Sequence, residues 1–217
     1  MSTPPKHHWL IVAIVAVAVL FGAWLYLRPG HPRPSRPATQ TITWHGEPRA
    51  LPDFRLNGAE GASVTPATLR GHWTLVFLGF TSCPDICPTT LLDMAKAQNR
   101  WHSLPEATRP LLLFVSADPE RDDLPRLAGY ARAFHEDTIA ATADIPTLER
   151  FIKPLGLVFM KVPNKGYPEN PLDYTIDHSA NVAVLDPQGR LAGAIRAPLD
   201  PEAIAEDLRK LTQDTTP

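Results

Sequence analysis

Residues 75–88 read LVFLGFTSCPDICP, an unbroken apolar run followed at once by Cys83 and Cys87. The 217-residue chain has no other cysteine. A small secreted domain that depends on disulfides needs several bridges spread along its sequence, and one adjacent pair closes a loop too short to add much stability. We therefore expect the pair to have a chemical role, rather than a structural one, at the end of a buried strand.

On both sides of this stretch, strand-like apolar runs alternate with helix-like segments. Strands are predicted over 74–80, 111–116, 139–142 and 157–162, hairpins near 54–64 and over 181–195, and helices over 89–102, 118–134, 145–151 and 201–212. The continuous apolar runs 75–80 and 111–116 suit central strands covered on both faces. The order strand, cysteine loop, helix, strand, helix, hairpin and helix predicts an α/β domain with a thioredoxin-like fold and added hairpins.

The N-terminal part of the chain predicts a membrane anchor. After a short tail, residues 1–8, the segment 9–27 carries no charge and would form a helix roughly 28 Å long, close to the thickness of a bilayer core. A cleaved signal peptide is the alternative, but its apolar region usually ends sooner. Residues 28–48 begin with a proline- and arginine-rich tract and are expected to form a spacer, with the folded domain at 49–217.

The charge balance excludes one class of partner. With 21 basic and 23 acidic residues, the chain lacks the positive field that nucleic-acid binding requires. The basic residues that flank the apolar segment favour a cytoplasmic domain, since Lys6 precedes it and Arg28, Arg33 and Arg36 follow. Thiols that exchange disulfides belong in an oxidising compartment, however. We therefore expect a single-pass protein of the bacterial inner membrane whose soluble domain faces the periplasm.

The spacing of the cysteines favours metal binding over simple redox exchange. A cysteine where a strand meets a helix N-terminus is expected to have a lowered pKa, and its thiolate is both nucleophile and metal ligand. If Cys83 and Cys87 lay at i and i+4 on one helix, their Cβ atoms would be roughly 5–6 Å apart, wider than a relaxed disulfide prefers. Thiolates select Cu(I), zinc or iron–sulfur centres, and the last two normally take four protein ligands. Two buried structural thiols are the alternative.

A third ligand is sought among the eight histidines. Most of the others lie in the tail, in the spacer or near predicted helix ends: His7, His8, His31, His102 and His135. His178 stands apart, between the polar loop 163–173 and a strand, with Asp177 beside it as a carboxylate that could orient the imidazole. Composition alone does not distinguish His178 from a solvated loop histidine.

Three sequence blocks occur together in this chain. They are GFTSCPDICPTTL at 79–91, VSADPERD at 115–122, and DHSA at 177–180 leading to DPQGR at 186–190. In combination they resemble the SCO/SenC family of copper chaperones for cytochrome c oxidase. The predicted anchor and spacer match the layout of that family as well.

The resemblance implies a thioredoxin-like fold with copper ligands at Cys83, Cys87 and His178. It also implies that one copper ion, as Cu(I) or Cu(II), is delivered to the copper A centre of an oxidase subunit. The expected partners are that subunit and an upstream copper donor or thiol reductant. Cys83 and Cys87 would form a redox-active disulfide when oxidised, a state that cannot ligate metal.

Two other functions remain open on the same residues. One is a thiol-disulfide reductase that keeps oxidase or other extracytoplasmic cysteines reduced, with either thiol as nucleophile and the other resolving. The other is a copper or redox sensor that signals through a partner. The sequence therefore leaves open whether the chain is an enzyme.

Two aspartates in these blocks, Asp118 and Asp85, lie outside the expected ligand set. Asp118 is expected to be structural, as the N-cap of a helix whose first residue is Pro119. Asp85, between the cysteines, could tune the charge of a thiolate or hold the turn, and no role is assigned to it.

Overall fold

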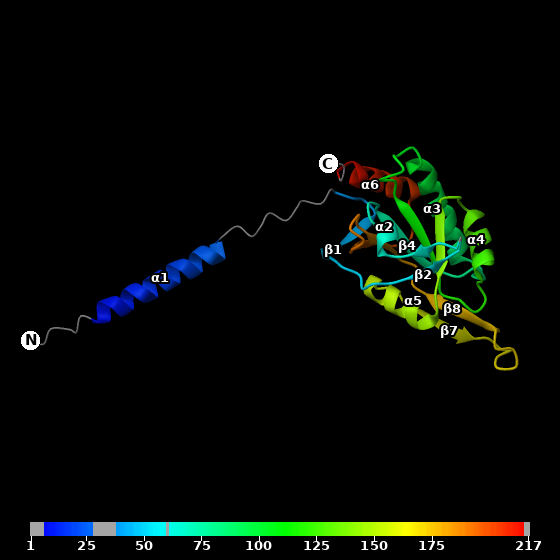
Figure 1. The fold of residues 1–217 in the computed structure, drawn as a ribbon, viewed down its shortest axis with the longest axis horizontal. Helices are drawn as coiled ribbons and strands as arrows, with labels where there is room; N and C mark the ends of the chain where they lie inside the picture. Colours follow the sequence, from blue (N-terminus) through cyan, green and yellow to red (C-terminus); the bar gives the residue numbers. More distant parts are fainter. Residues whose placement is uncertain (1–6, 28–37, 60, 215–217) are drawn as a thin grey trace, which may run out of the picture. The chain divides into compact units, whose positions relative to one another are not determined.

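The computed structural model describes most of the chain, namely residues 7–27, 38–59 and 61–214 (Figure 1). The chain divides into two compact units, Met1–Pro37 and Ala38–Pro217. The second unit contains every sheet and the predicted site, and the description below concerns it unless stated otherwise.

The first unit contains one helix, α1 (His7–Leu27). Within the described ranges, no helix combines the length and the apolar character that a bilayer crossing requires. The anchor predicted over residues 9–27 therefore finds no support in the structure. The proline- and arginine-rich tract at 28–37 lies outside the described residues.

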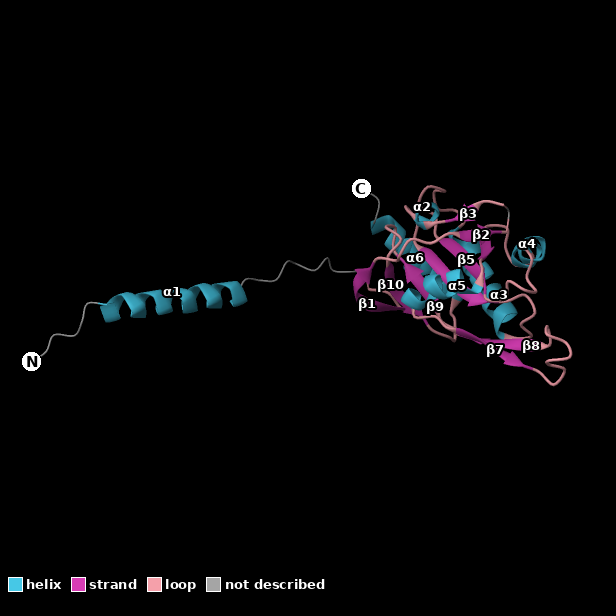
Figure 2. Cartoon of the chain, turned by 60° about the horizontal axis from the view of Figure 1, so that its bottom comes forward, coloured by secondary structure: helices cyan, strands magenta, loops and turns pink. Residues whose placement is uncertain are grey.

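The second unit is built on one large mixed sheet (Figure 2). Its eight strands lie in the order β1-β10-β9-β4-β5-β6-β2-β3. Their bounds are Ile42–Arg49 (β1), Leu56–Gly58 (β2), Ser63–Val64 (β3), Thr74–Gly79 (β4), Leu111–Ser116 (β5), Thr138–Thr142 (β6), Val182–Leu185 (β9) and Leu191–Ile195 (β10). β4, β5 and β6 run parallel, and β9 is antiparallel to β4. β4 is buried at all six positions, as expected for a central strand covered on both faces.

The helices of this unit connect and cover the strands. They are α2 (Pro66–Leu69), α3 (Ile86–Trp101), α4 (Leu124–Arg132), α5 (Ile145–Ile152), the 3-10 turn η1 (Lys153–Leu155) and α6 (Pro201–Asp214). The sequence specifies two of the starts clearly. Asp123 and Asp144 cap α4 and α5 by accepting from the backbone N–H three residues on, and each is followed by proline in the first turn.

Most of the predicted elements are confirmed. The strand predicted at 111–116 coincides with β5, and β9 and β10 form the predicted terminal hairpin. Two helix starts differ. α3 begins at Ile86 rather than residue 89, so Cys87 lies in its first turn while Cys83 precedes it. α4 begins at Leu124 rather than 118, because the backbone N–H groups of Arg121 and Asp122 donate to the Asp118 carbonyl in a separate turn and Asp123 caps the helix.

One strand, β1, lies almost entirely within the segment 28–48 that the sequence predicts to be a spacer. It pairs antiparallel with β10, in the register Ile42 with Ile195. Its sequence, ITWHGEPR, contains glycine and proline and buries Ile42 alone, which makes it a weak strand by local criteria. A partner some 150 residues away along the chain stabilises it.

A second, two-stranded sheet carries the predicted histidine. β7 (Phe159–Pro163) and β8 (Tyr174–His178) pair antiparallel, with Phe159 opposite His178. The polar loop predicted after Pro163 joins them. His178, expected in a loop, is the last residue of β8.

Candidate metal centre

Three separate elements bring the predicted ligands together. Cys83 lies in the loop after β4, Cys87 in the first turn of α3, and His178 at the end of β8. One potential ligand atom from each residue, two sulfurs and an imidazole nitrogen, lies within 4.8 Å of the others. Among the described residues they form the one group of three or more histidine, cysteine or acidic side chains close enough to hold a metal ion.

The contacts inside this group define its geometry. Cys87 Sγ lies 3.3 Å from His178 Nε2, and the backbone N–H of Cys87 donates to Cys83 Sγ at 3.4 Å. His178 Nδ1 lies 3.0 Å from the carbonyl oxygen of Ser179. A carbonyl only accepts, so this contact places the ring proton on Nδ1 and leaves the Nε2 lone pair directed at the cysteines. The imidazole is therefore oriented as a metal ligand requires.

The predicted role of Asp177 in orienting His178 is wrong. Successive side chains of a strand point to opposite faces, so Asp177 points away from His178 and is exposed. The carbonyl oxygen of Ser179 takes the position that a carboxylate would have filled.

Burial dominates the electrostatics of the site. The pKa of Cys87 is raised above its usual value, first because the thiol is buried and next because of the neighbouring Cys83. The position of Cys87 at a helix N-terminus predicts a lowered pKa, and the structure shows the opposite direction because the thiol is buried. Burial also lowers the pKa of His178, which keeps the imidazole neutral near pH 7. Metal loading must therefore displace the Cys87 proton, whereas the His178 imidazole is already neutral.

Apolar side chains and one glycine form the walls. The rings of Phe77 and Phe80 meet the His178 imidazole edge-on, with centroids 6.1 and 6.0 Å away. Gly79, the last residue of β4, leaves room for the sulfur, because a Cβ there would lie 2.7 Å from Cys87 Sγ and 2.9 Å from a ring carbon of Phe114. The LGF sequence before the cysteines therefore lets a strand pass directly beneath the thiol.

The two cysteines are not placed as their spacing on a helix would have them. Cys83 lies before the helix, so the pair does not sit at i and i+4 on one helix. The wide Cβ separation expected for that arrangement therefore does not apply, and the pair is suited to metal binding and to disulfide formation alike.

Asp118 is structural, but not in the way predicted. It is fully buried and accepts hydrogen bonds from Arg121 and from the hydroxyl of Tyr174, whereas Asp123 caps α4. Asp85 takes the N-cap position of α3 without a side-chain cap hydrogen bond and is exposed.

Sequence reasoning missed Asp122, the support under the cysteine loop. Its buried carboxylate accepts from the backbone N–H of Thr81 at 2.9 Å, from the Thr81 hydroxyl at 2.5 Å and from the Ser116 hydroxyl at 2.6 Å. Thr81 is two residues before Cys83, so these bonds position the start of the loop. The VSADPERD block contained both Asp122 and Ser116, but nothing local pointed to their partner at residue 81.

Comparison with known proteins places the chain in a family. The SCO1/SenC family model matches residues 44–213. The chain belongs to the SCO1/SenC family. A relative from Stutzerimonas stutzeri is 39% identical over 153 residues, which cover 70% of this chain and 71% of that protein. The mitochondrial SCO2 homolog of Bos taurus is 28% identical over 201 residues, 93% of this chain and 74% of that protein.

Solved structures of SCO1/SenC proteins share the fold. ScoI of Bradyrhizobium japonicum, solved with copper bound, is 31% identical with a TM-score of 0.66 and covers 75% of this chain and 99% of its own. Arabidopsis thaliana ScoI, also solved with copper bound, is 26% identical with a TM-score of 0.66 and covers 75% and 98%. The predicted family and the α/β thioredoxin-like fold are confirmed.

The unequal burial of the two cysteines predicts unequal reactivity. We expect iodoacetamide at pH 8 to modify Cys83 about tenfold or more faster than Cys87, because Cys83 is partly exposed and Cys87 is buried with a raised pKa. Peptide mass spectrometry after limiting alkylation measures the two rates. The Cys83→Ser variant controls for competition between the thiols. Equal or faster labelling of Cys87 would contradict the prediction that Cys83 is the more reactive thiol.

Proposed function

We propose that this SCO1/SenC chain is a copper metallochaperone. Copper is its cargo, held by Cys83, Cys87 and His178 and passed to the copper A centre of cytochrome c oxidase during assembly. The single observation that carries the proposal is the convergence of two sulfurs and an imidazole nitrogen within 4.8 Å. A set of two thiolates and one imidazole suits soft Cu(I), and zinc or iron–sulfur centres normally take a fourth protein ligand.

Release follows from the unequal exposure of the ligands. Cys83 is partly exposed while Cys87 is fully buried. An incoming thiolate from the target can therefore replace Cys83 or His178 first, and Cys87 holds the ion until last. Because Cu(I) imposes no strict geometry, ligands exchange one at a time without a high barrier. Oxidation of the pair to a disulfide would remove both sulfur ligands and block loading.

A thiol-disulfide reductase is the second candidate function. One observation favours it: an accessible Cys83 beside a buried Cys87 has the layout of an attacking and a resolving thiol. In that reaction, the Cys83 thiolate attacks a target disulfide and releases one target thiolate. Cys87 then displaces the second, so the target gains two electrons and the pair becomes a disulfide. A sensor that signals copper or redox state through a partner would use the same residues.

His178 distinguishes the two main functions. We expect His178→Ala to lower Cu(I) affinity about tenfold or more, because one of three ligands is lost, and to leave the rate of thiol exchange with a small disulfide within about twofold. Native mass spectrometry of copper-loaded protein under reducing conditions measures the first quantity and a thiol-exchange assay the second. Equal copper retention by His178→Ala and the parent would refute the three-ligand site and, with the exchange rate also unchanged, would favour the reductase.

The proposal also includes a location. We place the domain on the periplasmic side of a bacterial inner membrane, which the redox chemistry of the thiols favours. A reporter active only in the cytoplasm, fused to the C-terminus, should give no signal, and a signal would overturn this placement. Carbonate washing of membranes tests separately whether the uncharged run 9–27 anchors the chain.

A further inference from the structure

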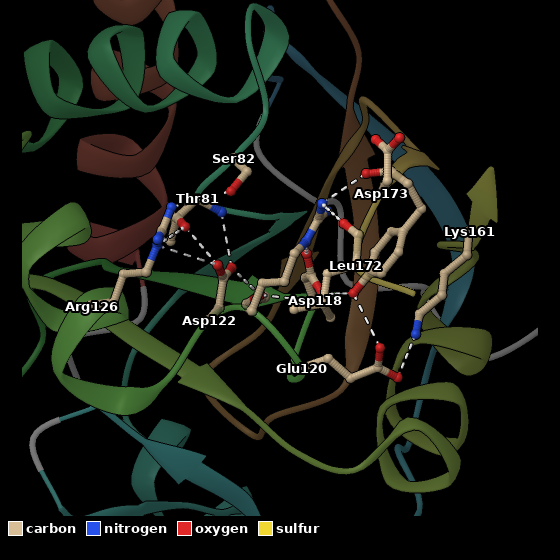
Figure 3. A network of polar contacts seen from close by, with 12 residues as sticks. Thr81, Ser82, Asp118, Glu120, Asp122, Arg126, Lys161, Leu172 and Asp173 are labelled. Carbon is tan, nitrogen blue, oxygen red and sulfur yellow. Dashed lines mark hydrogen bonds and ion pairs between the residues drawn. The ribbon is translucent and has the colours of Figure 1, made fainter. Parts of the chain in front are cut away.

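The loop between β5 and α4, residues 117–123, contacts both segments that carry the candidate ligands (Figure 3). Its Asp122 holds the residues that lead to Cys83, as described above. Its Asp118 and Arg121 reach in the other direction, to the first residue of the strand that ends at His178. One loop therefore contacts both of the segments that lead to the candidate ligands.

Arg121 binds the backbone at the start of β8. Its Nη1 donates to the carbonyl oxygen of Tyr174 at 2.7 Å and to that of Leu172 at 3.2 Å. Its Nε donates to Asp118 Oδ2 at 2.5 Å. The guanidinium carbon lies 3.9 Å from the centroid of the Tyr174 ring. A planar cation that donates in several directions and stacks on a ring cannot be replaced by a compact ammonium group.

Asp118 links Arg121 to the side chain of Tyr174. Its fully buried carboxylate also accepts from the Tyr174 hydroxyl at 2.6 Å, and Tyr174 itself is 4% exposed. A more exposed link runs beside it, where Lys161 of β7 pairs with Glu120 at 2.5 Å. The loop therefore holds both strands of the small sheet.

The geometry of β8 connects the contacts of Asp118 and Arg121 with Tyr174 to the metal centre. Alternate residues of a strand share a face, so Tyr174, Ile176 and His178 all point toward the domain, and the first and last are about 13 Å apart along the strand. Tyr174 and Ile176 are buried. The β7–β8 sheet shares no strand pairing with the eight-stranded sheet among the described strands. Side-chain and loop contacts must therefore set the position of β8.

We propose that Arg121 is a positioning residue that holds β8 so that His178 Nε2 stays within reach of the two cysteine sulfurs before copper arrives. The inference rests on the proposed copper function. A ligand held in place beforehand loses less freedom on binding, and partners outside the ligand set typically change metal affinity about 10–100-fold. Arg121→Lys keeps the charge and loses the planar fork, so we expect Cu(I) affinity about tenfold lower.

A double-mutant cycle tests whether Arg121 acts through His178. Cu(I) affinity of the full-length chain is measured by competition with a chromophoric Cu(I) chelator for Arg121→Lys, His178→Ala and the double variant. The Arg121→Lys change should cost about tenfold in the parent and less than about twofold once His178 is absent. The matched control is Arg209→Lys, in an exposed pair with Glu206 on α6, which should change affinity less than about twofold. An equal loss in both backgrounds would overturn the proposal.

A second measurement needs no copper. Amide hydrogen exchange in the metal-free chain should be faster over β8 in Arg121→Lys than in the parent or Arg209→Lys, with β4 and β5 unchanged. Unchanged exchange over β8 would overturn the positioning role. If the parent binds no copper, the proposed function fails, while this measurement still decides whether Arg121 holds β8. Tyr174→Phe, which removes only the hydroxyl donated to Asp118, is the variant to use should Arg121→Lys not fold, with the same direction of change expected.

Discussion

Replacing Cys87 by serine is expected to lower the affinity for Cu(I) at least about a hundredfold. Even the loss of a residue that only supports a metal ligand costs about 10–100-fold, and this change removes a ligand. The hydroxyl that replaces the thiol is a hard donor that does not ionise near neutral pH, so it cannot substitute for a thiolate. The same change abolishes the disulfide. Competition with a chromophoric Cu(I) chelator under reducing conditions measures the affinity.

The control for this variant has to place a hydroxyl in the same kind of environment. Ala97→Ser does so, because Ala97 is fully buried on the same helix, α3, away from the site. Its copper affinity should match that of the parent. If Cys87→Ser bound Cu(I) as tightly as Ala97→Ser, Cys87 would not be a ligand and the proposed centre would be wrong.

Replacing Asp122 by alanine is expected to lower the free energy of unfolding by about 3–5 kcal/mol. Its carboxylate is 1% exposed and accepts three hydrogen bonds from Thr81 and Ser116, all of which lose their acceptor. For a chain of this size the change corresponds to a fall in Tm on the order of 10 °C. Thermal unfolding of the metal-free protein measures it.

An aspartate that differs mainly in burial is available as the control. Asp93 forms an i,i+3 ion pair with the exposed Lys96 on α3, and Asp93→Ala should cost less than about 1 kcal/mol. A loss for Asp122→Ala no larger than that for Asp93→Ala would show that the buried network is not a major source of stability. Copper affinity should fall with Asp122→Ala as well, because Thr81 leads directly to the cysteine loop.

The sequence alone predicts the central architecture, because the signals involved are local. The runs that became β4 and β5 are apolar at nearly every position, which is typical of strands buried on both faces. Asp144 followed by Ile145 and Pro146 marks a helix start through capping, which acts within one turn. The choice of Cys83 and Cys87 as the reactive pair follows from their isolation in the chain. The family follows from three short blocks.

Other features depend on residues far apart in the chain, and local patterns carry no information about them. β1 becomes a strand because β10 pairs with it, and β8 pairs with β7 across the ten-residue segment 164–173. Resemblance, not spacing, predicted His178 as the third ligand, and its 3.3 Å contact with Cys87 exists only because the fold brings the end of β8 to the first turn of α3. The carboxylates of Asp118 and Asp122 likewise find their partners only in the folded chain.

The cysteine pair shows both what the local sequence determines and what depends on the tertiary structure. Sequence determines that two thiols follow a buried strand and lie just before or at the start of a helix, since hydrophobic periodicity is a local signal. Their state is a tertiary property. Cys87 is buried close to Gly79, and this burial raises its pKa, while Cys83 remains partly exposed. Desolvation depends on every atom packed around the sulfur, and the helix-end rule that predicted a lowered pKa describes the backbone alone.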